Sequence, residues 1–132
     1  MPARRRIDTT AGRAALAAWS AHPPSDPVDR ATMATAVRFT LEELAARAPG
    51  NSVEVRVPPF AAVQCVAGPR HTRGTPPNVV EMAPEVWLAL AVGRSKWDKA
   101  ITSGSVLASG RRTDLSGLLP LFCDGPPGPG PA

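Results

Sequence analysis

The beginning of the chain carries an apolar stripe with helical spacing. Ala15, Leu16 and Trp19 share one face, and the alanines around them favour a helix over about residues 10–21. Residues 22–27 contain three prolines, which cannot continue a helical hydrogen-bond ladder. We therefore expect a short first helix that ends in a loop.

A second helix follows, and its apolar face is the clearest periodic signal in the sequence. Asp29 is a suitable N-cap, and residues 49–51 end the helix. Phe39 falls on the polar side, so it needs a partner, and the first helix is the expected one. The apolar positions recur at spacings of four, four, three and four residues: Met33, Val37, Leu41, Leu44 and Ala48.

The middle of the chain changes to a two-residue alternation. Val53, Val55 and Val57 are expected to point into the core, while Glu54 and Arg56 face solvent, because side chains alternate along a strand. This pattern predicts a half-exposed strand. Further strands are predicted over residues 60–67, 78–82 and 105–109.

Apolar helical segments alternate with the last strands. One helix is predicted to begin at Pro84, which suits a first helical position, and to end at Gly93. Ser95 and Asp98 have the spacing of a capping box, with Ser95 as the N-cap of a short helix. A last apolar helix is expected over residues 115–119.

This order of elements predicts an α/β fold of the α+β type. We expect a mostly antiparallel sheet of four to five strands covered by helices. Residues 1–123 are predicted to form a single domain, with a helical pair at about residues 8–48. Residues 124–132 consist largely of Gly and Pro, so they are expected to be disordered and dispensable.

Composition excludes several classes of protein. At 43% hydrophobic and 20% charged residues, the 132-residue chain can build one core. The net charge of +4 is not concentrated, and codon usage explains the arginines as well as a binding role does. The Arg4–Arg6 run lacks interleaved aromatics, so nucleic-acid binding is not expected. No apolar signal region or membrane span follows it, so we expect a cytoplasmic protein without an integral membrane segment.

Metal binding and catalysis find little support in the sequence. The four candidate metal ligands, His22, Cys65, His71 and Cys123, do not have zinc-site spacing. There is no G-x-S-x-G motif, and no catalytic residue and no cofactor are expected. Cys65 with His71 would be a nucleophile pair, but the strand position of Cys65 favours a buried, inert thiol.

The second half of the chain resembles the sterol carrier protein family. The resemblance covers roughly residues 51–122 and is closest to the small proteins of the actinobacterial branch. It depends on two helices ending in Gly, a strand ending in Gly and a final apolar segment. The residues that carry it are 84–93, 97–104, 106–110 and 114–121.

This resemblance implies a fold and a kind of ligand. Family members have a mostly antiparallel sheet covered by helices, and those of known function hold lipids or fatty acyl groups in an apolar tunnel between sheet and helices. Related domains also occur as non-catalytic parts of acetyltransferases and of thiol-dependent isomerases. The C-terminal residues Pro131–Ala132 do not match a peroxisomal targeting signal.

Two groups of residues are candidate ligand contacts. In the loop of residues 68–77, Arg70, His71 and Arg73 supply positive charge for a carboxylate or phosphate, although a solvated hairpin loop would have the same composition. An apolar group on the later helices would line a cavity, although ordinary core packing uses the same residue types. These apolar candidates are Trp87, Leu90, Trp97 and Ile101.

The sequence therefore leads to a non-catalytic binding domain for an apolar, acyl or lipid ligand. The alternative is an accessory domain without a ligand, which docks onto a partner enzyme or forms a homodimer through an apolar surface, with Phe39 as the candidate contact. A third hypothesis is an enzyme acting on a thiol conjugate.

Overall fold

The computed structural model describes residues 6–23, 25–68, 78–111 and 113–122. Its elements run, in chain order, α1 (Thr9–Ala21), α2 (Arg30–Arg47), β1 (Val53–Val57), β2 (Ala61–Cys65), β3 (Val79–Met82), α3 (Pro84–Ala91), α4 (Trp97–Thr102), β4 (Val106–Ser109) and the 3-10 helix η1 (Ser116–Leu118).

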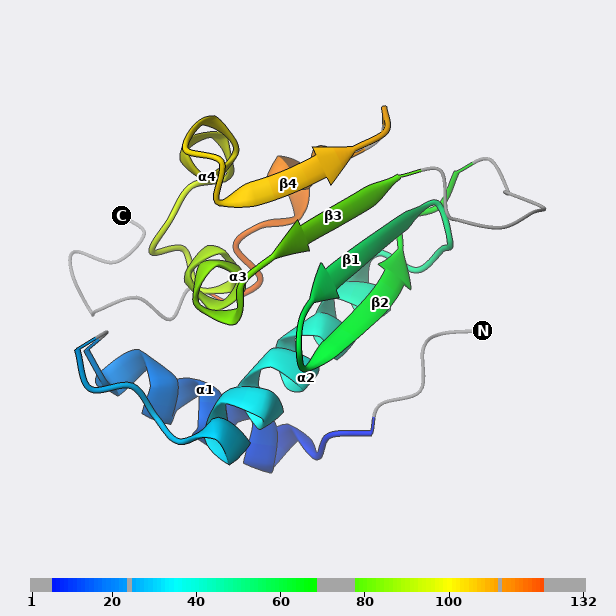
Figure 1. Ribbon diagram of the computed structural model, residues 1–132. Coiled ribbons are helices and arrows are strands. Elements are labelled where there is room, and N and C mark those ends of the chain that lie inside the picture. The colour runs from blue at the N-terminus through cyan, green and yellow to red at the C-terminus, as the bar shows by residue number, and fades with distance from the viewer. Residues whose placement is uncertain (1–5, 24, 69–77, 112, 123–132) are drawn as a thin grey trace, which may run out of the picture.

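The four strands form one mixed sheet in the order β2-β1-β3-β4. β1 is antiparallel to β2 and parallel to β3, and β3 is antiparallel to β4. Figure 1 shows α1 and α2 on one side of the sheet, with α3 and α4 near the end where β3 finishes and β4 begins. The predicted α+β class and the mostly antiparallel pairing are confirmed.

The alternation predicted for the first strand is also confirmed. Val53, Val55 and Val57 are fully buried in β1. Arg56 and Glu54 lie on the opposite face, where the guanidinium and the carboxylate form an ion pair of 2.8 Å. This arrangement leaves one face of the sheet for the core and the other for solvent.

Phe39 has the partner that its position on α2 requires. The side chain is only 1% exposed, because α1 crosses it at Gly12 and the ring of Phe122 stacks on it with centroids 5.6 Å apart. The guanidinium groups of Arg13 and Arg47 lie over the Phe122 ring at 5.9 and 5.4 Å. Packing of the first helix on Phe39 is confirmed, and Phe39 is not an exposed docking residue.

The predicted cap of the short helix is wrong. Lys96 occupies the N-cap position of α4 and makes no side-chain cap hydrogen bond. Ser95 instead lies in the turn after α3, where its backbone N–H donates to the carbonyl of Ala89. The last predicted helix is reduced to the short η1, in which the Asp114 carboxylate accepts from the N–H of Ser116.

Several predictions fall on segments outside the described residues. These are the charged loop with Arg70, His71 and Arg73, the Cys123 thiol and the tail of residues 124–132. Within the described part of the chain, no helix is both long and apolar enough to cross a membrane.

Candidate functional site

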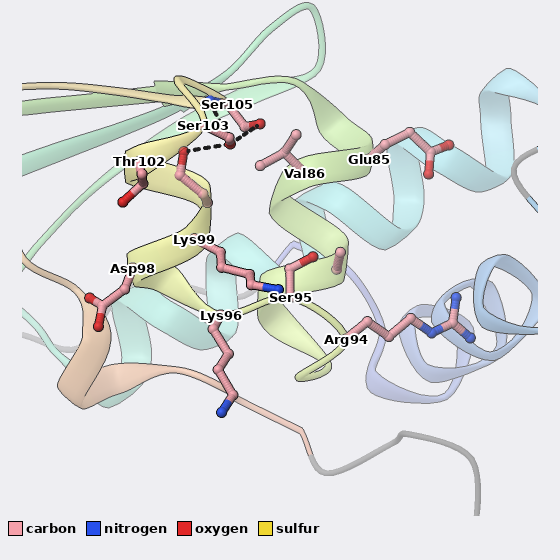
Figure 2. Close-up of a pocket in the computed structure, with 12 residues that line it drawn as sticks. Glu85, Val86, Arg94, Ser95, Lys96, Asp98, Lys99, Thr102, Ser103 and Ser105 are labelled. Atoms are coloured by element: carbon pink, nitrogen blue, oxygen red, sulfur yellow. Dashed lines mark hydrogen bonds between the residues drawn. The ribbon is translucent and has the colours of Figure 1, made fainter.

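A groove of about 1000 Å³ runs between α3 and α4 (Figure 2). It combines small apolar side chains, hydroxyls and charged groups from the two helices, their linker and the turn before β4. The lining residues are Glu85, Val86, Ala89, Arg94, Ser95, Lys96, Asp98, Lys99, Ala100, Thr102, Ser103 and Ser105.

The apolar wall of the groove is the part of α3 that the core does not use. Trp87 and Leu90 on this helix are 0% and 1% exposed, so they face inward. Val86 directly precedes Trp87 in sequence, Ala89 directly precedes Leu90, and both remain half-buried. Figure 2 shows Val86 directed into the space between α3 and α4, where Ala100 of α4 also contributes to the lining.

The only two lysines of the chain, Lys96 and Lys99, both line the groove. Figure 2 shows Lys99 extending from α4 toward Ser95, while the Asp98 side chain points away from it. Among the described residues, no carboxylate pairs with the Lys99 ammonium. This group is therefore available to an anionic ligand.

Hydroxyl groups line the other end of the groove. The Ser103 and Ser105 Oγ atoms are 2.8 Å apart and share a hydrogen bond. The Ser103 hydroxyl also donates to the carbonyl of Ala100 at 3.2 Å, which holds it at the end of α4. These groups offer hydrogen bonds to a polar part of a ligand.

The two remaining charged lining residues are tied to α1. Trp19 donates its indole Nε1–H to the Glu85 carboxylate at 3.0 Å. The Arg94 guanidinium lies 4.9 Å over the Trp19 ring and donates to the Ser20 hydroxyl at 2.7 Å and to the Ser20 carbonyl. Both charges are thus held at the edge of the groove.

The apolar residues proposed from the sequence lie in two places. Trp87, Leu90 and Trp97 are buried in the core, and the Trp87 indole Nε1–H donates to the Thr40 hydroxyl at 2.7 Å. Ile101 is 39% exposed and lines a second groove of about 530 Å³ beside β4. Neither groove is lined by the three buried residues, so a ligand contact for them stays a prediction.

Sequence reasoning overlooked Lys96 and Lys99 as site residues. Their signal was present, because they are the only lysines in a chain whose other basic residues are arginines. The neighbouring serines gave no such signal, since a groove between two helices depends on how those helices pack.

The Cys65 thiol, which the sequence offers as a candidate nucleophile, is neither ionised nor accessible. Burial raises the pKa of the Cys65 thiol to about 11, so the reactive thiolate is scarce at neutral pH. The thiol is also fully buried, beyond the reach of a substrate. Within the described residues, no cluster of three or more His, Cys, Asp or Glu side chains is arranged to hold a metal ion.

The comparison with protein families agrees with the fold. The family model described as bacterial SCP ortholog matches residues 29–121, which include every described strand and all described helices except α1. No curated protein matches the chain. The chain therefore belongs to the sterol carrier protein family, among its bacterial SCP orthologs.

Proposed function

We propose that this domain binds an amphipathic ligand in the α3–α4 groove without transforming it. The supporting observation is the groove itself, where Val86, Ala89 and Ala100 form an apolar surface beside the Lys99 ammonium. Its volume of about 1000 Å³ is at the upper end of small-molecule sites. An acyl chain on the apolar wall would place its acidic head group near Lys99.

The apolar wall and the Lys99 ammonium would contribute separately to the binding free energy. Each methylene that leaves water contributes about 0.8 kcal/mol before the cost of association. A hydrogen bond to a charged group adds about 1.5 to 3 kcal/mol. The ligand is therefore expected to be an acid with a long apolar body rather than a small anion.

The absence of catalysis is part of the proposal. Domains of this family are generally non-catalytic carriers. The buried, protonated Cys65 thiol agrees with that role, and it argues against an enzyme that acts on thiol conjugates. The Arg70 and Arg73 loop remains a second candidate for the acidic head group.

A titration with fatty acids of increasing chain length tests this proposal, with the matching alcohols as neutral counterparts. We expect affinity to rise with length, and tryptophan emission to shift because Trp97 lies between groove residues of α4. Lys99→Met keeps most of the apolar stem, and it should weaken acid binding about tenfold while hardly changing alcohol binding. Arg111→Met removes an exposed arginine beyond β4 and controls for net charge.

Two results would contradict this assignment. Affinity that does not rise with chain length would exclude an apolar ligand body. Acid binding that survives Lys99→Met but falls in Arg70→Ala would move the head group to the loop and away from the groove.

A second candidate function is self-association through the edge strand β4. The exposed large hydrophobic side chains of the described residues, Ile101 at 39% and Leu107 at 65%, both line the groove beside this strand. The partner that fits best is a second copy of the chain, because the exposed segment of residues 103–110 carries no charge on a protein of net charge +4.

A further inference from the structure

We infer that α1 is a positioning element for the α3–α4 groove, with Trp19 as its main positioning residue. The inference rests on the proposed function of that groove. The helix precedes residues 29–121, so it lies outside the part of the chain that the family model matches.

Trp19 reaches the groove through its indole edge. The side chain is 5% exposed, so packing fixes the ring and leaves little freedom to the N–H group. This N–H donates to the Glu85 carboxylate at 3.0 Å across a sequence separation of 66 residues. Glu85 lies in the first turn of α3 and is itself exposed, so the indole is the contact that directs its carboxylate.

The face of the same indole holds a charge of the opposite sign. The Arg94 guanidinium lies 4.9 Å from the Trp19 ring, and hydrogen bonds to the hydroxyl and carbonyl of Ser20 keep it there. One residue of α1 and its neighbour thus anchor two charged side chains that line the groove.

The consequence is a groove whose centre keeps a single sign of charge. Figure 2 shows Glu85 and Arg94 extending away from Val86 and Lys99, toward the side where α1 lies. A released Glu85 carboxylate would be free to turn toward Lys99 and compete with an anionic ligand for its ammonium. Trp19 therefore sets the preference of the groove for acids over neutral ligands.

A double-mutant cycle on the full chain tests this role, with the ratio of fatty-acid to fatty-alcohol affinity as the readout. Trp19→Phe keeps a buried aromatic ring but removes the N–H donor. It should lower this ratio about threefold, which is the size of one exposed ion-pair interaction. In the Glu85→Gln background there is no carboxylate to release, so Trp19→Phe should leave the ratio unchanged.

A matched control separates positioning from loss of stability. Phe39→Leu weakens the packing of α1 on α2 at a residue that does not line the groove, and it should change both affinities equally. A ratio that falls in Phe39→Leu as well, or that falls in Trp19→Phe whether or not Glu85 is present, would overturn the inference.

A measurement without ligand tests the anchor directly. The protein has three tryptophans, so its indole N–H signals are resolved by NMR, and Trp19→Phe assigns one of them. Glu85→Ala removes the acceptor, so it should shift that signal and speed its exchange with solvent, and an unchanged signal would overturn the anchor. A wild-type protein that binds no acid would overturn the proposed function, and the positioning role with it, whatever the indole signal shows.

Discussion

Phe39 is held between two parts of the chain that lie far apart in sequence. Gly12 lets α1 approach so closely that a Cβ atom at this position would lie 2.3 Å from the Phe39 ring. On the other side, Phe122 stacks on Phe39 at 5.6 Å. The absence of a Cβ atom at Gly12 therefore determines how closely α1 and α2 pack.

Gly12→Ala is expected to destabilise the protein, although alanine favours a helix interior by about 1 kcal/mol. The clash involves the Phe39 Cβ and ring atoms, which cannot move without shifting α2. Overpacking of this kind costs about 1 to 3 kcal/mol. Urea unfolding measures the net effect, and Gly117→Ala, where nothing lies within 4 Å, is the control expected to cost nothing.

Removal of the aromatic ring gives a second measure of the same contact. Phe39→Ala should cost roughly 3 kcal/mol or more, because the ring is buried on both sides. A stability loss well below that figure, or a Gly12→Ala protein more stable than wild type, would show that α1 does not pack as described.

Elements with strong local signals were predicted well from the sequence. The expected helix over residues 10–21 is Thr9–Ala21, and the alternating segment is the strand Val53–Val57. The weaker capping-box signal gave a wrong prediction, because the Ser95 N–H donates to a carbonyl of α3 and Ser95 is not the N-cap of α4. The α3–α4 groove was not predictable, since it depends on the distance and angle between two helices that no local pattern encodes.

The N-cap of α2 makes this helix sensitive to acid. The Asp29 carboxylate accepts from the Thr32 N–H at 2.9 Å, and hydrogen bonds from the side chain and backbone of Thr32 lower its pKa below 3.8. A lowered pKa means that the stabilisation is complete above the unfolded pKa and is lost as the pH falls through the folded value.

Asp29→Asn separates capping from charge, because asparagine is an equally good N-cap. We expect the variant to unfold at nearly the wild-type temperature at pH 7, and to lose less of its melting temperature than wild type between pH 5 and pH 3. Thermal unfolding followed by circular dichroism over this range is the measurement. Parallel losses in the two proteins would show that the Asp29 charge does not contribute.

At the scale of the whole molecule, β4 is an edge strand of the described sheet. Among the described strands, β4 pairs only with β3, so no other described strand pairs with its outer side. Natural edge strands usually carry a charge, a proline or a bulge that prevents pairing with another chain, but residues Val106–Ser109 include neither a charge nor a proline. Two β4 strands paired antiparallel would close a two-fold dimer and cover Leu107 and Ile101 in both copies.

Sedimentation at increasing protein concentration tests this dimer. We expect wild type to associate more strongly in higher salt, because screening weakens the repulsion between two molecules of net charge +4.

Leu107→Lys should remain a monomer without losing stability, since this side chain is 65% exposed in the single chain. Ala62→Lys adds the same charge to an exposed position on the opposite edge strand, β2, and should leave association intact apart from added repulsion. A wild-type protein that stays monomeric at the highest soluble concentration would exclude self-association and leave the groove as the functional surface.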